Sequence, residues 1–516
     1  MTLYATNGTF SRGSVPDTNG SIFEVNLAGM RTIANNRHIL ADSGDHTLVG
    51  DGNANQRDAM IYDLIYNGRV NLDGTSQRFA NTFTSFELGM GGDVLDLSVD
   101  PDHQAAYGLP DYVANVTAVG SEGDDWMWSG EGDDQLYGDE LNSGLISIDI
   151  NLFGGGFGDL IEGGGGTDTI HGDFGSLSLV GVTVSAFTLG DDVLVGDYGG
   201  DTIYGDYATS SLIDVSVSLF AFGHDDIDGG DGNDVIYGDA AAVGTISIAP
   251  NALRLGEDWI LGGEGDDQIY GDPGAAGQVI QLGVTLLNFV SDQIHGENGD
   301  DIIVGDSAGD LLSAATGGDD LLFGDAGNDT ITGDYTGALS SLVATLNFGD
   351  DEIEGGAGAD MLVGDYRSGL GLTAANLLTF GDDTLLGGEG NDTIYGDTSN
   401  LAILGLGAGQ DRVVGGGGDD DMWGDFPGLL TLVGGADTFV IGQGDGADTI
   451  HDFRLASDRI VFDGVAGAGS WSEVQGLISY SGGSAVIDLG GGNQVELTGV
   501  TGLLFDVLGA GNFEFL

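Results

Sequence analysis

The stretch GGEGDDQIYGD, from Gly262 to Asp272, decides the fold because the chain repeats it with small changes. It returns as GGDGNDVIYGD from Gly229 and as GGEGNDTIYGD from Gly387. Around each copy three aspartates keep a fixed phase: the second follows the first by nine residues, and the third follows the second by five. Ten such repeats begin 28 to 34 residues apart. A period of this length predicts a solenoid in which each repeat forms one coil.

Alignment of the ten repeats gives three columns of aspartates, and we predict that all of them are metal ligands. An acidic surface that only serves solubility scatters its carboxylates, whereas these recur at fixed spacing. Column 1 is Asp125, Asp159, Asp192, Asp225, Asp258, Asp292, Asp320, Asp351, Asp383 and Asp411. Column 2 is Asp134, Asp168, Asp201, Asp234, Asp267, Asp301, Asp329, Asp360, Asp392 and Asp420. Column 3 is Asp139, Asp173, Asp206, Asp239, Asp272, Asp306, Asp334, Asp365, Asp397 and Asp425.

The repeats resemble the nonapeptide G-G-x-G-x-D-x-U-x, with U a large aliphatic residue, of the repeats-in-toxin (RTX) family. The resemblance covers about residues 121–433. It implies a parallel β-roll in which multiple Ca²⁺ ions lie between successive turns. The physics agrees, because calcium takes six to eight oxygen ligands and one glycine-rich turn supplies only part of that shell. The aliphatic residues Ile236, Ile269, Ile303 and Ile394 should face inward from very short strands.

The sequence departs from the family pattern after each third aspartate. A segment of about 9 to 18 residues intervenes before the next repeat, as at residues 176–189 and 279–290. These inserts alternate aliphatic residues with Ser, Thr or Gly, which predicts one or two added strands per coil. The predicted fold class is therefore all-β: a parallel β-solenoid of about ten coils, an RTX β-roll widened by inserted strands, with β-rich end caps.

Composition limits the partners. The chain has 83 acidic and 11 basic residues, a formal net charge of −72, and no Cys. Such a polyanion repels nucleic acid and anionic lipid, so we expect no nucleic-acid partner, and its self-repulsion requires a cation in the folded state. No stretch reaches the 18 or so apolar residues of a membrane helix, which predicts no membrane insertion.

The two ends differ from the repeats. Residues 1–120 hold six of the eleven Arg and only fragments of the repeat, and we interpret them as a β-rich cap or a partner module. Residues 434–516 resemble the C-terminal segment of serralysin-type secreted proteases, which carries a type I secretion signal. The ending FEFL, from Phe513 to Leu516, fits that signal. The resemblance implies the type I secretion machinery as a partner and a secreted, extracellular or cell-surface location.

We do not expect an enzyme. None of the seven His has the H-E-x-x-H spacing of a zinc protease. We also expect no G-x-S-x-G nucleophile elbow of a lipase. Neighbouring carboxylates such as Asp266 and Asp267 recur along the repeats, whereas a catalytic pair occurs once. A column of five tyrosines is expected to point outward, either as stacked rings or as a carbohydrate-binding strip: Tyr137, Tyr204, Tyr237, Tyr270 and Tyr395.

Two functions remain open. The first is a secreted calcium-binding structural protein of surface-layer, adhesin or self-assembling type, which folds on calcium outside the cell and contacts copies of itself or a surface polysaccharide. The alternative is a calcium-binding carrier module of an extracellular polysaccharide-modifying enzyme.

Overall fold

The computed structural model describes the strands before residue 158, residues 134–138, and most of the chain after residue 157. The later described ranges are 158–180, 183–184, 187–213, 216–217, 220–242, 253–273, 279–280, 287–311, 315–337, 345–367, 377–399, 408–427, 434–502 and 507–516. The chain forms two compact units, residues 1–241 and 242–516. The predicted domain boundaries near residues 120 and 433 stay predictions.

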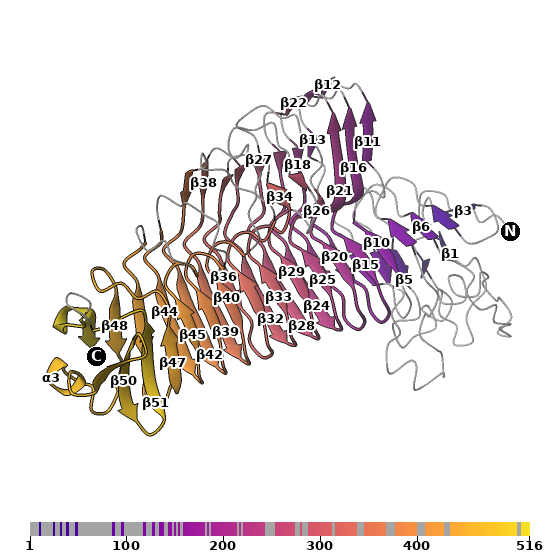
Figure 1. Ribbon diagram of the computed structural model, residues 1–516. Coiled ribbons are helices and arrows are strands. Elements are labelled where there is room, and N and C mark those ends of the chain that lie inside the picture. The colour runs from indigo at the N-terminus through magenta and orange to yellow at the C-terminus, as the bar shows by residue number, and fades with distance from the viewer. Residues whose placement is uncertain are drawn as a thin grey trace, which may run out of the picture. The chain divides into compact units, whose positions relative to one another are not determined.

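In the first unit, each repeat contributes one strand to each of two parallel sheets (Figure 1). The strand after the column 1 aspartate enters the first sheet, and the strand after the column 2 aspartate enters the second. The first sheet contains β5 (Thr47–Val49), β7 (Val94–Asp96), β9 (Trp126–Trp128), β14 (Leu160–Glu162), β19 (Val193–Val195) and β24 (Asp226–Asp231). The second contains β4 (His38–Leu40), β6 (Ser85–Glu87), β8 (Thr117–Val119), β10 (Gln135–Tyr137), β15 (Thr169–His171), β20 (Thr202–Tyr204) and β25 (Val235–Tyr237).

Both sheets thus extend before residue 121 with parallel strands. The repeat fragments at residues 44–51 and 91–98 become β5 and β7, which pair in register, Thr47 with Val94. Two antiparallel pairs accompany them: β1 (Phe10–Ser11) with β2 (Glu24–Val25), and β3 (Arg31–Ile33) with β4.

The inserts of the first unit form the added strands that their alternation predicts, and Figure 1 shows them rising beside the two sheets. A coil there adds three strands rather than one or two, because the insert pairs as three separate segments, residues 174–180, 183–184 and 187–188. They stack in three small parallel sheets: β11 (Ser143–Ile146), β16 (Phe174–Val180) and β21 (Tyr207–Ile213); β12 (Asp149–Ile150), β17 (Thr183–Val184) and β22 (Ser216–Val217); β13 (Phe153–Gly154), β18 (Phe187–Thr188) and β23 (Phe220–Ala221).

The second unit repeats this plan. Its first sheet contains β28 (Trp259–Glu264), β32 (Gln293–Asn298), β36 (Leu321–Phe323), β39 (Glu352–Ala357), β42 (Thr384–Glu389), β44 (Arg412–Gly417), β46 (Thr438–Ile441), β48 (Arg459–Phe462) and β52 (Phe513–Phe515). Its second sheet contains β29 (Gln268–Tyr270), β33 (Ile302–Val304), β37 (Thr330–Thr332), β40 (Met361–Val363), β43 (Thr393–Tyr395), β45 (Asp421–Trp423), β47 (Ala447–Ile450) and β51 (Asn493–Thr498).

The remaining elements are the strands of the second unit's inserts, those near residue 242 and the elements at the C-terminal end. The inserts of the second unit give β30 (Val279–Ile280) with β34 (Asp310–Leu311), and the row β31 (Leu287–Asn288), β35 (Ala315–Thr316), β38 (Thr345–Asn347) and β41 (Leu377–Thr379). Near residue 242 lie β26 (Ala240–Ala242) and β27 (Leu253–Arg254). At the C-terminal end, β49 (Ile478–Ser481) and β50 (Ser484–Gly490) join β51 in antiparallel pairs, beside α3 (Trp471–Val474) and the 3-10 turn η1 (Ala510–Asn512).

The core consists of aliphatic rows between the two sheets. Register aligns the same residue of each coil, for example Ile269 with Ile303. Ile236, Ile269, Ile303 and Ile394 are fully buried, which confirms that they face inward. No helix in the described ranges is long and apolar enough to cross a membrane.

Candidate metal centre

The predicted ligand columns are buried. All 28 of these aspartates that lie within the described residues are at most 4% exposed. Asp125 and Asp139 lie outside the described residues. Column 2 follows the tight turn from the first sheet to the second, and we call this the short-turn edge. Columns 3 and 1 lie on either side of each insert, where the chain returns to the first sheet, and we call this the insert edge.

At the short-turn edge the two oxygens of each carboxylate differ. The backbone N–H of Asp329 donates to Oδ1 of Asp360 at 2.8 Å, and that of Asp360 donates to Oδ1 of Asp392 at 2.9 Å. Oδ2 of Asp329, Asp360 and Asp392 is buried and has no hydrogen-bond partner in the structure. One oxygen therefore ties successive coils together, while the other is left for a ligand of positive charge.

The glycine-rich turns bring the backbones of successive coils close together. Gly388 has a φ of +105°, and a Cβ added to it would lie 2.0 Å from the carbonyl oxygen of Gly356. Glycine is the residue that reaches this angle without strain and leaves room for that carbonyl. Asp197, Glu297 and Asp325 occupy the same turn position with φ between +64° and +72°. The turn conformation is thus kept even where the glycine is replaced.

The insert edge offers two carboxylates per coil. Asp383 donates its backbone N–H to Oδ1 of Asp411 at 2.9 Å, and Gly409 donates its N–H to Oδ1 of Asp397 at 2.9 Å. Oδ2 of Asp397 and Oδ2 of Asp411 are both buried without a hydrogen-bond partner in the structure. The hydrogen bond from Gly409 holds the column 3 carboxylate beside column 1, so an insert of variable length does not disturb the edge.

Burial and mutual repulsion oppose ionisation of these groups. Burial raises the pKa of Asp301 to about 8, of Asp329 to about 7 and of Asp360 to about 6. At the insert edge burial raises the pKa of Asp411 well above its usual range, and the neighbouring carboxylate of Asp397 raises it further. Buried carboxylates without a counter-charge are costly, so the folded state requires either protons or cations along both edges.

This donor set fits calcium. The partnerless atoms are carboxylate oxygens beside glycine turns whose carbonyls are within reach, and calcium is a hard cation that prefers six to eight oxygens in flexible geometry. Across the described part of the chain, no group of three or more His, Asp or Glu side chains has metal-site geometry. Backbone carbonyls would therefore have to supply much of the coordination shell.

Four aspartates that extend the columns were missed by the sequence analysis: Asp437, Asp448, Asp452 and Asp458. Asp437 accepts from the N–H of Asp411 at 3.2 Å, and Asp448 accepts from Asp420 at 3.3 Å. Asp452 accepts from Asp425 at 3.0 Å, and Asp458 accepts from Asp437 at 3.3 Å. The spacing from Asp437 to Asp448 is 11 residues instead of nine, which hid this coil. The part of the repeat pattern that remains here is an Asp two residues before a large apolar residue, at Phe439, Ile450 and Ile460.

The expectation that the chain lacks a G-x-S-x-G pattern, typical of hydrolase nucleophiles, is wrong at the level of sequence, because residues 305–309 read GDSAG. Ser307 within it is fully buried, and its hydroxyl donates to the carbonyl of Pro273 at 2.7 Å. The preceding Asp306 belongs to column 3. The pattern therefore forms part of the insert edge.

The tyrosine column is stacked and largely covered. Tyr137, His171, Tyr204 and Tyr237 stack with ring centroids 4.7 to 5.3 Å apart. Tyr137, Tyr237 and Tyr270 are at most 9% exposed, so these rings are largely covered, which disfavours the carbohydrate-binding strip. The stacking interpretation is the one that the geometry favours.

Exposed aspartates form a separate row beside column 1. The N–H of Asp350 donates to Oδ1 of Asp319 at 2.9 Å, and the N–H of Asp382 donates to Oδ1 of Asp350 at 2.8 Å. These carboxylates make the same backbone hydrogen bond as the buried columns but face solvent.

A family model described as the RTX calcium-binding nonapeptide repeat matches the chain at ten places. They are residues 117–143, 151–176, 188–207, 222–242, 255–275, 291–312, 314–334, 346–365, 379–400 and 406–426. Each match contains one aspartate from each of the three columns. The chain belongs to the RTX calcium-binding repeat family. Multiple Ca²⁺ ions are therefore the cofactor of this RTX protein, as predicted.

Among solved structures, the extracellular lipase LipA from Serratia marcescens is similar to the RTX chain at 18% sequence identity with a TM-score of 0.21. The similarity covers 50% of this chain and 40% of the lipase, so the RTX chain spans less than half of that relative. At this TM-score the likeness supports no conclusion about function. A comparison with curated protein sequences found no significant match.

Proposed function

We propose that this RTX protein is a secreted structural protein of the cell surface or extracellular matrix, without enzymatic activity, which folds when calcium fills its two edges. The observation that carries the proposal is the burial of carboxylate pairs such as Asp397 and Asp411, whose Oδ2 atoms have no partner. At pH 7, where the formal net charge is −72, closing such coils requires metal cations along the edges.

The calcium ligands in this proposal are the three predicted columns. At the short-turn edge, column 2 carboxylates and turn carbonyls of two successive coils would hold the ions. At the insert edge, columns 1 and 3 would hold them. Bound calcium would supply positive charge and cross-link neighbouring coils, while backbone N–H groups orient column 1 and column 2 carboxylates such as Asp411 and Asp360 through Oδ1.

Extracellular modules bind calcium at roughly 0.1 to 1 mM, far above the concentration inside a cell. The proposal therefore places folding outside the cell, after export by a type I secretion system. Calcium titration followed by circular dichroism tests it, and we expect a cooperative gain of β signal in this range, because a ligand that binds only the folded state stabilises it. A full β spectrum in excess chelator at pH 8 would contradict the proposal.

The finer role, as an adhesin or as a self-assembling layer, is tested by light scattering of the calcium-loaded protein. Larger species that form with calcium and disperse in chelator support self-assembly. The alternative of an enzyme's carrier module is tested by incubation with acidic polysaccharides, where release of product would favour it.

A further inference from the structure

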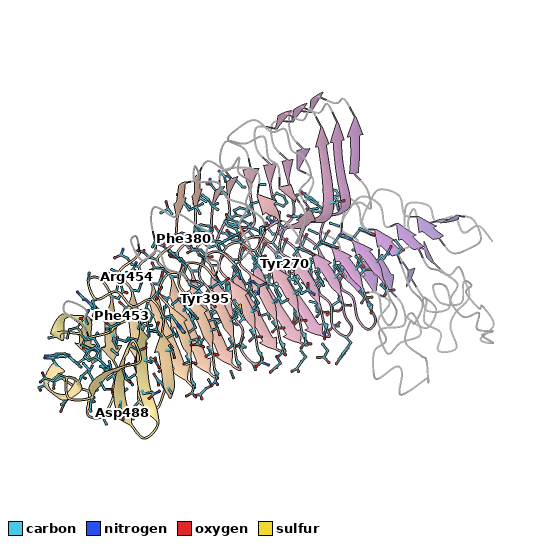
Figure 2. All side chains as sticks on the ribbon, viewed as in Figure 1. Tyr270, Phe380, Tyr395, Phe453, Arg454 and Asp488 are labelled. Atoms are coloured by element: carbon cyan, nitrogen blue, oxygen red, sulfur yellow. The ribbon has the colours of Figure 1, made fainter. Side chains whose placement is uncertain are left out.

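Arg454 lies at the C-terminal end of the insert edge of the second unit and is labelled in Figure 2. Its Nη2 atom is 2.7 Å from Oδ2 of Asp425, 3.0 Å from Oδ2 of Asp437 and 3.6 Å from Oδ1 of Asp458. The same nitrogen donates to the carbonyl of Gly435 at 2.7 Å. The guanidinium group is thus surrounded by three carboxylates and a carbonyl oxygen.

The preceding gap shows the same edge without the arginine. Asp397 and Asp425 are both column 3 residues, held by the N–H of Gly409 and of Gly435 at 2.9 and 2.8 Å. Asp411 and Asp437 are successive column 1 residues. Oδ2 of Asp397 and of Asp411 has no partner, whereas the corresponding atoms of Asp425 and Asp437 both bind Arg454.

The chain also makes room for this group. The position before the glycine that holds column 3 is Phe348, Phe380, Ala408 and then Gly434 in successive coils. Phe348 and Phe380 are buried and stacked with ring centroids 5.1 Å apart. At Gly434 an added Cβ would lie 1.0 Å from Nη1 of Arg454, so a side chain there and the guanidinium group exclude each other.

We propose that Arg454 is a built-in cation that takes the place of calcium in the last gap of the insert edge and so ends the ion column. The inference rests on the proposed calcium sites of columns 1 and 3. It implies a latent site: Oδ2 of Asp425, Oδ2 of Asp437 and the carbonyl oxygen of Gly435 form an oxygen set that calcium can fill once the guanidinium group is removed.

The test counts bound calcium by equilibrium dialysis of the full chain. We expect Arg454→Met, which keeps the apolar stem and removes the charge, to bind about one calcium ion more than the unmodified chain. Adding Asp437→Asn to Arg454→Met should abolish the gain. Arg459→Met is the matched control, because Arg459 is exposed on the neighbouring strand β48, and its calcium count should not change.

An Arg454→Met chain that folds by circular dichroism but binds no additional calcium overturns the inference. So does an Arg454→Met chain that fails to fold at saturating calcium, because calcium should replace the missing charge. Failure of the underlying calcium assignment is seen separately, as an Asp397→Asn chain that binds as much calcium as the unmodified one.

Discussion

A column 2 aspartate combines two properties that no other residue supplies together. Its short side chain places Oδ1 on a backbone N–H of the preceding coil, as Asp360 does for Asp329 at 2.8 Å. Its second oxygen carries charge in a buried position where a neutral amide would present N–H donors instead. Aspartate is therefore needed at every coil, which explains why the columns are so regular in sequence.

Replacing Asp360 by Asn should weaken calcium binding without removing the hydrogen bond that Oδ1 accepts. The amide nitrogen replaces Oδ2, and the calcium midpoint for folding should rise roughly tenfold, about 1.4 kcal/mol. The matched control is Asp350→Asn, which alters an exposed aspartate that accepts a comparable backbone hydrogen bond from Asp382. Calcium titrations followed by circular dichroism compare the two, and equal shifts would show that burial of Asp360 is irrelevant.

Comparing Gly388→Ala with Gly444→Ala separates the strain of the left-handed backbone from the close approach of a neighbouring carbonyl. Gly388 has a φ of +105° and meets the Gly356 carbonyl, whereas Gly444 has a φ of +100° and nothing within 4 Å of an added Cβ. We expect Gly444→Ala to cost about 1 to 2 kcal/mol of unfolding free energy, from the left-handed backbone alone. Gly388→Ala should cost more, measured by thermal unfolding in calcium. Equal losses would mean that the coils can shift apart freely.

At this scale the sequence was informative wherever the spacing was regular. The inward isoleucines and the buried aspartates follow from strand alternation and from a constant offset. Asp437 and Asp448 were missed because an insertion of two residues changes that offset without changing the coil. The contacts of Arg454 could not be predicted, since they join residues that the sequence separates by up to 29 positions.

At the scale of an edge, the carboxylates act as one titrating array. An unfolded Asp titrates near pH 3.9, whereas burial raises the pKa of Asp301 to about 8 and of Asp360 to about 6 in the fold. A raised folded pKa contributes stability that is present below about pH 4 and is lost as pH rises through 6 to 8. Protons can therefore substitute for calcium only at acidic pH.

In chelator, the β signal should consequently be larger at pH 5 than at pH 8. With calcium present the pH dependence of folding reverses, because the ions bind deprotonated carboxylates. The calcium concentration at the folding midpoint should therefore be higher at pH 6 than at pH 8. Circular dichroism at each pH measures both effects. A chelated chain that is equally unfolded at pH 5 and pH 8 would contradict the buried array.

The elements themselves were predictable to different degrees. Alternation in residues 176–189 predicted the insert strands, although it did not predict their division into the three segments 174–180, 183–184 and 187–188. The antiparallel strands β49 to β51 were not predicted, because residues 434–516 were interpreted through a family resemblance rather than through their own pattern. The strands before residue 121 were foreseen as fragments, but their parallel pairing depends on neighbours distant in sequence.

At the scale of the whole molecule, the C-terminal end of the chain is proposed both to cap the last coil and to carry the secretion signal. Phe513 in β52 is 7% exposed, and its ring stacks with Trp471 at 5.4 Å and with Phe462 at 5.9 Å. The segment interpreted as a secretion signal is therefore part of a folded sheet. A secretion machinery could read it only before this sheet forms, which agrees with folding after export.

Deleting residues 434–516 should leave the protein inside the cell. Retention alone is ambiguous, because the deletion also exposes the core of the last coil. A more specific experiment fuses residues 434–516 to an unrelated passenger protein. Its secretion is compared with that of the same passenger fused to residues 434–506. Secretion of the truncated RTX chain at the normal level would show that the C-terminal interpretation is wrong.

The exposed row of Asp319, Asp350 and Asp382 makes this protein resemble a polyelectrolyte. Stacked strands are about 4.8 Å apart, so the row carries one charge per 4.8 Å or so, comparable to the charge per roughly 3.4 Å on a single nucleic-acid strand. The row is three charges long, because Ser291 and Gln410 hold the flanking positions. Exchangeable cations should therefore gather near these three carboxylates without any dedicated site and disperse as salt rises, distinct from the ions fixed between the coils.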